Sequence, residues 1–461
     1  MIDFFDECTI GSIKFVNMSE KITLVGGGLA GSLMSIYLAK KGYEVHLYER
    51  RGDMRQGKYE GGRSINLALS TRGIHALSKV GLVDDILGIS IPMSGRMMHS
   101  VKGDLAYQAY GREDQAIYSV SRGELNIRLL QLADQYKNIH MYFDHKCTSA
   151  NLETNETTFV NADGETVKDK ADVVLSTDGA FSAVRDAMIR YPRYNFSQSY
   201  ENYGYKELEI VPGENHTFQM EEKALHIWPR KSFMMIALPN PGGNFTCTLF
   251  MPYDGELSLS SLTTKEAVDQ FFNEYFPDAV PMMPNLVEDF FQNPTGNLAT
   301  MRCYPWVKNK VALMGDSAHA VVPFYGQGMN CSFEDCVVLD QCIEQFKGDW
   351  NKILDEYQRS RKPNADAIAN LALQNFIEMR DLVGSPEFLH KKHVEHELVE
   401  RYSDIYKSQY ERVTFSNDGY LDALNWGAKN DALLETIISN KWEDRISDDS
   451  FMRNLILETQ K

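Results

Sequence analysis

Positive charge is scarce in this sequence. Its 461 residues include 47 Lys and Arg against 64 Asp and Glu, which gives a formal net charge of −17. Affinity for nucleic acid comes mainly from Lys and Arg side chains that displace counterions at phosphates. The charge balance therefore argues against a nucleic-acid partner, and any anionic ligand must meet cations and backbone N–H groups that are placed locally.

The sequence also lacks the marks of a secreted, metal-binding or membrane protein. Its seven cysteines are scattered and include no Cys-x-x-Cys pair, which speaks against a disulfide framework and a zinc site and favours a reducing compartment. The N-terminus is acidic where a signal peptide needs a basic start. No window, the last residues included, approaches the roughly 18 apolar residues of a membrane span. We expect a cytoplasmic protein with no metal and no membrane partner.

The predicted elements indicate an α/β fold in a chain long enough for two or three domains. Residues 21–26 read as a buried strand, 29–41 as a helix and 43–49 as a second strand, which together make a βαβ unit with parallel strands. Residues 203–253 read as successive strands separated by Pro and Gly turns. We predict a discontinuous Rossmann-type domain (20–200 and 296–345) interleaved with a mixed β-sheet domain (201–295) and followed by a helical C-terminal region (346–461).

A glycine motif lies between the first strand and the helix. Residues Gly26, Gly28 and Gly31 fit G-x-G-x-x-G, with Leu29 and Ala30 inside the motif. The first glycine permits the tight turn, the second lets backbone N–H groups approach a pyrophosphate, and the third allows close packing of helix and strand. Glu49 ends the second strand about 20 residues further on, where an acid accepts hydrogen bonds from ribose hydroxyls. The motif predicts a bound dinucleotide but leaves NAD and FAD open.

Two more turns follow predicted buried strands. Asp178-Gly179 follows residues 172–176, and Gly315-Asp316 follows residues 310–315 and leads through the loop 323–330 into a helix. A short acid on a glycine turn at the carboxyl end of a strand can hydrogen-bond a sugar or ribityl chain, because the backbone can approach closely there. Taken alone, each turn is weak evidence for a site that binds a sugar or ribityl chain.

All three motifs in this order resemble the flavoprotein aromatic hydroxylases, which are single-component FAD monooxygenases. The resemblance implies a tightly but non-covalently bound FAD, with its ADP half at the first motif, its ribityl chain at the last Asp and an Arg contact to the flavin. The middle Asp would contact FAD and NADPH, and a helix N-terminus would lie near the flavin ring. The residues implied, besides those of the first motif, are Arg122, Asp178, Asp316, Gly328, Met329 and Asn330. No second fingerprint follows, so NADPH is expected to bind transiently.

Several stretches narrow the resemblance to one branch of that family. Residues 62–70, 95–99, 108–112, 225–229 and 323–330 look like those of the kynurenine 3-monooxygenases, and the resemblance runs from about residue 20 to 415. It implies hydroxylation of L-kynurenine at C3 with NADPH and O₂ through a flavin C4a-hydroperoxide, in tryptophan degradation and NAD biosynthesis. The last part of the chain, 416–461, resembles nothing that we recognise.

The same resemblance implies a set of substrate residues. A guanidinium with phenol and amide donors suits the substrate carboxylate, and the implied residues are Arg96, Tyr110, Asn375 and Tyr410. The implied apolar ring pocket consists of Ile236, Leu238, Phe250, Pro323, Phe324 and Met379, although Ile236 and Leu238 are equally compatible with plain core. No catalytic base is obligatory, because the aniline nitrogen already makes the reacting ring carbon electron-rich. Gln327 is our hypothesis for a catalytic donor to the hydroperoxide or the substrate ketone.

Some alternatives stay open at this point. The chain could be a related FAD hydroxylase that acts on another aromatic acid, or a nucleotide-binding protein without turnover. The oligomeric state is also open, a homodimer included, as is the contact made by Tyr325.

Overall fold

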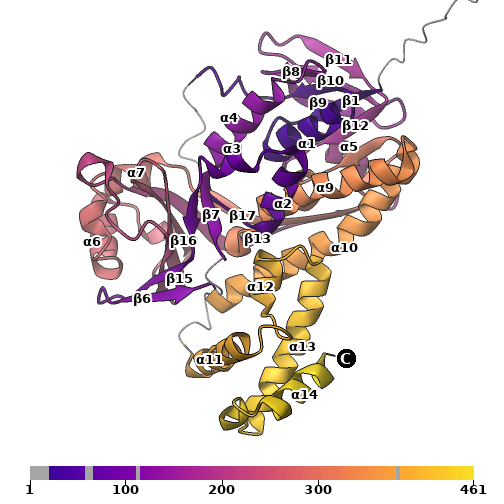
Figure 1. Ribbon diagram of the computed structural model, residues 1–461. Coiled ribbons are helices and arrows are strands. Elements are labelled where there is room, and N and C mark those ends of the chain that lie inside the picture. Colours follow the sequence, from indigo (N-terminus) through magenta and orange to yellow (C-terminus); the bar gives the residue numbers. More distant parts are fainter. Residues whose placement is uncertain (1–19, 58–65, 111–114, 380–384, 461) are drawn as a thin grey trace, which may run out of the picture.

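The computed structural model describes residues 20–57, 66–110, 115–379 and 385–460. Within these ranges, two large β-sheets lie beside each other with helices around them, and a group of C-terminal helices lies beneath (Figure 1). This arrangement confirms the predicted class, an α/β protein with a Rossmann-type sheet, a second mixed sheet and a helical C-terminal region.

The first large sheet is the parallel sheet that the βαβ pattern predicts. Its strands stand in the order β18-β19-β12-β1-β2-β8, and all run parallel except β18. Their bounds are β1 (Lys21–Val25), β2 (Glu44–Tyr48), β8 (Ile139–Tyr142), β12 (Val173–Ser176), β18 (Val307–Lys308) and β19 (Val311–Leu313). Every residue of β1 after Lys21 is buried, which is typical of a parallel strand that is covered on both faces.

Helices and a small antiparallel sheet cover the first sheet. Helix α1 (Leu29–Lys40) packs beside α4 (Arg122–Ala133) and α9 (Gly328–Phe346). The small sheet consists of β9 (Lys146–Asn151), β10 (Glu156–Val160) and β11 (Thr166–Lys170). It meets the first sheet through the stacked rings of Tyr48 and Phe159, whose centroids are 3.9 Å apart. In an open parallel sheet of this kind, a ligand is expected at the carboxyl ends of the strands.

The second large sheet combines segments that are distant in the sequence. Its strand order is β17-β13-β16-β15-β14-β5-β6, antiparallel except where β14 lies beside β5. The bounds are β5 (Gly95–His99), β6 (Leu105–Ala109), β13 (Asn195–Ile210), β14 (Ala224–Arg230), β15 (Phe233–Pro239), β16 (Phe245–Pro252) and β17 (Gly296–Tyr304). The sheet thus takes strands from outside the predicted segment 201–295, and the domain boundaries stay a prediction.

Side chains of the second sheet alternate between two environments. On β15, Met235 and Ala237 pack in an apolar cluster with α6 (Lys265–Tyr275) and α7 (Leu286–Gln292), whereas Ile236 and Leu238 lie in other clusters on the opposite face. The alternation follows from the two-residue period of a strand. The sheet therefore turns one face to its own helices and the other toward the rest of the molecule.

A further small sheet joins the two large ones. It has the order β3-β7-β4, formed by β3 (Asn66–Leu69), β7 (Ile117–Ser121) and β4 (Ile91–Met93). The hydroxyl of Ser119 donates to the carbonyl of Pro239 at 2.8 Å, which ties β7 to the end of β15. The short helices of this half of the molecule are α2 (Thr71–Val80), α3 (Val83–Leu87), α5 (Ala183–Ile189) and α8 (Asp316–His319).

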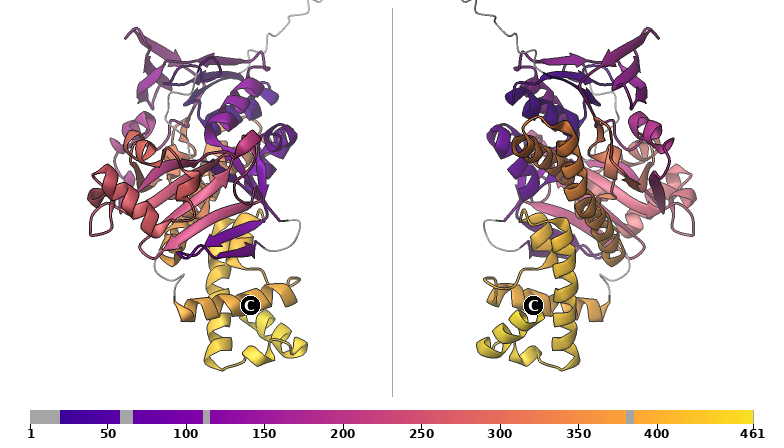
Figure 2. Two further views of the ribbon diagram at one scale, coloured as in Figure 1. Left: turned by 90° about the vertical axis from the view of Figure 1, so that its left-hand side faces the viewer. Right: turned by 90° about the vertical axis from the view of Figure 1, so that its right-hand side faces the viewer.

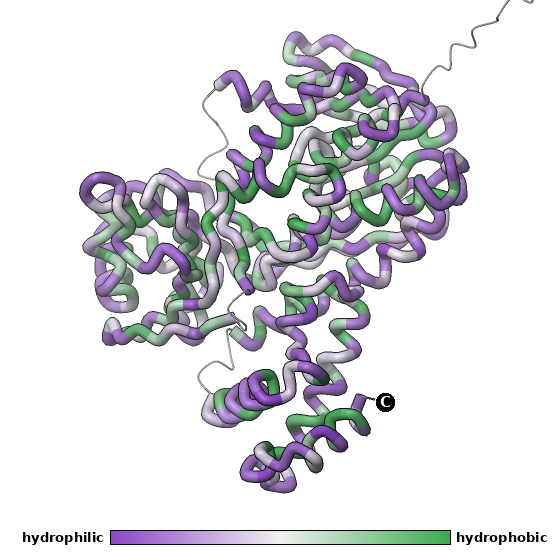
Figure 3. Tube along the Cα trace, in the orientation of Figure 1, coloured by the Kyte–Doolittle hydropathy of each residue, from purple (hydrophilic) through white to green (hydrophobic). Residues whose placement is uncertain are grey.

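The C-terminal helices have an apolar core of their own. They are α10 (Trp350–Ile377), α11 (Pro386–Arg401), α12 (Gln409–Thr414), α13 (Tyr420–Ser439) and α14 (Asp449–Thr459). Helices α11, α13 and α14 stand below the sheets in both side views (Figure 2), whereas α10 packs along α9. Polar and apolar residues alternate along these helices (Figure 3). Leu398, Tyr402, Leu433 and Met452 are among the residues of this core, which lies between α11, α13 and α14. No described helix is both long and apolar enough to cross a membrane.

Candidate active site

A cavity of about 450 Å³ extends from the glycine motif to the inner face of the second sheet. Residues of all three sequence motifs line it, together with side chains of β14, β15 and β16 and of the C-terminal helices. The loop 323–326 and the first residues of α9 lie along it between these regions. The same cavity therefore joins the predicted dinucleotide site to the predicted substrate residues.

The glycine motif has the geometry that its sequence requires. Gly26 has φ of +106°, and a Cβ there would lie 2.5 Å from the carbonyl oxygen of Thr177. A Cβ on Gly31 would run into the carbonyl oxygen of Gly26. Gly28, Leu29 and Ala30 line the cavity at the start of α1. The backbone N–H groups of this helix end are thus available to an anionic pyrophosphate.

Glu49 is bound to the glycine turn. Its Oε2 accepts a hydrogen bond from the Gly27 N–H at 2.8 Å, and its Oε1 accepts one from Arg51 Nε at 2.7 Å. The residue is only 6 % exposed but lines the cavity. A carboxylate has about four acceptor sites, so Glu49 can hold the turn and still accept a ribose hydroxyl.

The two motif aspartates, Asp178 and Asp316, differ in their hydrogen bonding. The carboxylate of Asp178 accepts hydrogen bonds from the Ala183 N–H at 2.8 Å and the Ser317 hydroxyl at 2.9 Å, as well as from Ser176. Asp316 also lines the cavity, but no described residue hydrogen-bonds its carboxylate. Asp316 therefore has all of its acceptor sites open to ligand hydroxyls, whereas Asp178 uses most of its own in the turn before α5.

Of the residues predicted to lie near the flavin, some line the cavity and one does not. Gly328 and Met329 line the cavity at the start of α9. Asn330 is buried and does not; its Oδ1 accepts from the Ser70 N–H at 3.0 Å, and its Nδ2 donates to the Ala68 carbonyl at 2.9 Å. Arg122 begins α4, lines the cavity and has no acidic partner among the described residues.

A buried ion cluster supports the turn that carries Asp316. Asp335 accepts hydrogen bonds from the Gly315 N–H at 2.8 Å and from Arg361 Nε at 2.7 Å, and its Oδ2 lies 2.7 Å from His319 Nε2. Burial raises the pKa of Asp335, but His319 and Arg361 outweigh it and lower the value to about 2. The ionised carboxylate thereby fixes the turn between β19 and α8.

At the other end of the cavity, Arg96 lies against two tyrosine rings. Its Cζ is 4.6 Å from the ring centroid of Tyr410 and 5.3 Å from that of Tyr110, and the two rings are stacked at 5.7 Å. Arg96 Nε and Tyr110 Oη are buried and have no hydrogen-bond partner. No acidic side chain pairs with Arg96 in the described parts of the chain, so a cation and a phenol are left for an anionic ligand.

The electrostatics of this cluster keep Arg96 and Tyr110 protonated. Burial alone lowers the pKa of Arg96, but the oxygens of Tyr410 and Tyr110 raise it above the usual value. Burial raises the pKa of Tyr110 well above its ordinary range, even though Arg96 opposes the shift. Asn375 of α10 adds an amide whose Nδ2 donates to the Phe324 carbonyl at 2.7 Å.

An apolar pocket adjoins the cluster. All six residues predicted for it line the cavity: Ile236, Leu238, Phe250, Pro323, Phe324 and Met379. The ring of Phe324 stacks on Phe376 at 4.2 Å, and Tyr325 stacks on Tyr410 at 5.8 Å. The contact that the sequence left open for Tyr325 is therefore with the Arg96 cluster.

Gln327 does not line the cavity. It is 2 % exposed; its Oε1 accepts from the Tyr420 hydroxyl at 2.8 Å, and its Nε2 lies 3.4 Å from Ser70 Oγ. Sequence reasoning missed Tyr420, which lies in the segment that carries no recognised motif. It also missed Met234 and Thr248, which line the cavity; their two-residue spacing from Ile236 and Phe250 was the available signal.

Comparisons with known proteins identify the family of this chain. A family model described as an FAD binding domain matches residues 20–372. The kynurenine 3-monooxygenase of Myxococcus xanthus is 47 % identical over 421 residues, which cover 91 % of this chain and 90 % of that protein. That of Dictyostelium discoideum is 47 % identical over 436 residues, 91 % of this chain and 94 % of that protein.

Solved structures add a likeness of fold. The p-nitrophenol 4-monooxygenase of Pseudomonas putida matches with a TM-score of 0.67 at 18 % identity, over 88 % of this chain and 98 % of that chain. The family model and the relatives together define an FAD-dependent monooxygenase. Within that class, the chain belongs to the kynurenine 3-monooxygenase family.

Proposed function

We propose that this protein hydroxylates L-kynurenine at C3, with NADPH and O₂, to give 3-hydroxy-L-kynurenine. The observation that carries the proposal is a cavity that joins the FAD motifs to Arg96, a half-buried cation without an acidic partner in the described chain. The close relatives, which bear the name kynurenine 3-monooxygenase, support the choice of substrate.

The residues of the first motif, with Asp316 and the start of α9, are suited to hold FAD. When bound, FAD supplies the reaction with NADPH and O₂. The protein supplies orientation and a water-poor pocket. Arg96, Tyr110 and Tyr410 bind the substrate carboxylate, and the apolar side chains of β15 and β16 hold the aromatic ring against the flavin end of the cavity.

No general base is assigned to the reaction. The amino group on the substrate ring already makes the adjacent carbon electron-rich, so no protein base is needed to activate the ring. Gln327 would act from behind the cavity wall, through the loop that leads into α9. NADPH would bind transiently, and the scattered cysteines support a cytoplasmic location.

The test is a visible spectrum of the purified protein and NADPH oxidation with and without L-kynurenine. We expect a yellow flavoprotein, faster NADPH oxidation when kynurenine is present, and a product heavier by one oxygen atom. A colourless protein that takes up no FAD contradicts the proposal. Equal stimulation by other aromatic acids would favour the alternative of a related FAD hydroxylase.

A further inference from the structure

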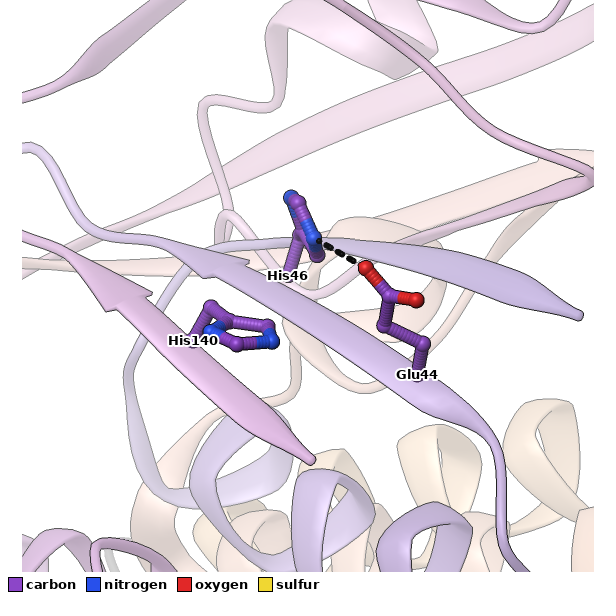
Figure 4. A group of neighbouring side chains, drawn as sticks. All are labelled: Glu44, His46 and His140. Atoms are coloured by element: carbon purple, nitrogen blue, oxygen red, sulfur yellow. Dashed lines mark hydrogen bonds and ion pairs between the residues drawn. The ribbon is translucent and has the colours of Figure 1, made fainter. Parts of the chain in front are cut away.

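Two histidines and a glutamate gather at the edge of the first sheet, outside the cavity. Glu44 and His46 are two residues apart on β2, so their side chains point to the same face. His140 on the edge strand β8 is the register partner of His46. Figure 4 shows the three side chains grouped across these two strands. No sequence spacing signals this group, because strand pairing alone brings His140 to the other two.

The potential ligand atoms of the group are close to one another. Glu44 Oε1 lies 3.1 Å from His46 Nε2, and the rings of His46 and His140 have centroids 5.1 Å apart. One ligand atom from each residue can be chosen so that all lie within 4.8 Å of one another. Zn–N and Zn–O bonds of about 2.0–2.2 Å separate tetrahedral ligands by roughly 3.5 Å. Small side-chain rotations would therefore bring the three groups onto one ion.

The other nitrogen of His46 already faces a carboxylate. His46 Nδ1 is buried, has no hydrogen-bond partner and lies 3.6 Å from Asp169 Oδ1. Asp169 is held in place by Lys21 and Thr23. Histidines that bind a metal through one nitrogen usually donate the other N–H to a carboxylate or carbonyl, which fixes the ring and its tautomer. Asp169 is in the right place for that support.

We propose that Glu44, His46 and His140 form a Zn²⁺ site with Asp169 as the support of His46. Two imidazoles and one carboxylate suit zinc, whereas Mg²⁺ and Ca²⁺ prefer oxygen ligands throughout. His140 is exposed and Glu44 is partly exposed, so water can reach the remaining coordination position. A bound ion would link the edge strand β8 to β2, the strand that leads to Glu49. The site is separate from the FAD and substrate residues and does not depend on the proposed reaction.

The test measures zinc retained by the FAD-loaded protein after equilibrium dialysis. The variants are His140→Gln and Glu44→Gln, whose side chains are accessible, with His46→Gln as a third. The control is His393→Gln on α11; His393 is 68 % exposed and lies 3.4 Å from Glu397. We expect wild type and control to retain one zinc more than each of the three variants. Zinc held by thiols is common to all these proteins and cancels in the difference.

Two further measurements sharpen the result. Asp169→Asn keeps all three ligands, and we expect it to bind zinc about 10- to 100-fold more weakly. Zinc should raise the Tm of wild type but not of His140→Gln, because binding to the folded state alone stabilises it. Excess Mg²⁺ should not displace the zinc.

Equal zinc content in wild type, His140→Gln and Glu44→Gln overturns the proposal, as does wild type without bound zinc. Retained FAD absorbance shows that each variant is folded. If His46→Gln fails to fold, the two accessible variants still decide the question.

Discussion

The hydroxyl of Tyr420 donates a hydrogen bond to Gln327 Oε1 at 2.8 Å and so joins helix α13 to the loop before α9. The guanidinium of Arg72 stacks on the same tyrosine, with Cζ 3.9 Å from the ring centroid, and Arg72 Nε donates to the Val413 carbonyl at 3.1 Å. The C-terminal helices are therefore connected to the wall of the cavity from behind. Gln327 cannot rotate freely without breaking this bond.

Tyr420→Phe should lower the fraction of NADPH that is coupled to product, as Gln327→Ala should. The substitution keeps the ring but leaves Gln327 Oε1 unsatisfied in a buried place, at a cost of about 1–3 kcal/mol in the free energy of unfolding. The measurement is product formed per NADPH consumed, with the Tm followed in parallel.

The matched control for this prediction is Tyr402→Phe. The Tyr402 hydroxyl donates to the Ile446 carbonyl at 2.6 Å in the core of the C-terminal helices. Its loss should lower stability without changing the coupling. If Tyr420→Phe and Gln327→Ala leave the coupling at the wild-type ratio, Gln327 has no part in the reaction.

Arg96→Met should raise the KM for kynurenine while FAD stays bound. Hydrogen bonds to a charged group contribute about 1.5–3 kcal/mol, so kcat/KM should fall about 10- to 150-fold. Steady-state kinetics and flavin content are the measurements. Arg359→Met, on the exposed face of α10, is the control and should behave as wild type. An unchanged KM in Arg96→Met would place the substrate carboxylate elsewhere.

Asp316→Asn and Asp178→Asn should separate ligand binding from stability. Asp316 has no hydrogen-bond partner among the described residues, so its substitution should weaken FAD binding about tenfold or more and leave the Tm of the apoprotein unchanged. Asp178 accepts from Ala183 and Ser317, so its substitution should lower that Tm. The measurements are FAD titration and thermal unfolding of the apoprotein. The opposite pattern would exchange the roles of the two acids.

Asp335→Asn should destabilise the protein by about 3–5 kcal/mol at neutral pH, because it leaves buried His319 and Arg361 without their shared carboxylate. The pKa of Asp335 is lowered to about 2. The stabilisation by this ionised carboxylate is therefore complete when the pH is above the ordinary pKa of an aspartate, and it is lost as the pH falls toward 2. Urea unfolding at several pH values should show the gap between wild type and variant narrowing in that range. A gap that stays constant down to pH 2 contradicts this account.

The parts of the site that sequence reasoning found are those that depend on local backbone. The turn at Gly26 needs a positive φ, and Gly31 needs the absence of a Cβ, so both leave a visible trace in the sequence. The parallel sheet was likewise predictable from short buried strands around one helix. Arg96 and Tyr410 were named only through family resemblance, because nothing local indicates that residues so far apart meet.

Other features could not be predicted from the sequence, because they also depend on contacts between distant residues. β5 joins the second sheet by pairing with β14, a strand more than a hundred residues away, and brings its neighbour β6 with it; such distant pairing leaves no local pattern. Asp178 and Asp316 cannot be distinguished from their sequence context, since each is an acid on a glycine turn. Only the hydrogen bonds distinguish the acid that is occupied from the one that is open.

The alternation along β15 has an evolutionary consequence. Met234, Ile236 and Leu238 form cavity wall, while Met235 and Ala237 between them hold the sheet to α6 and α7. Mutations at the first set change the shape of the pocket as well as the packing, whereas mutations at the second set act on the packing alone. New substrate preferences in this lineage should therefore accumulate at every second position of the strand.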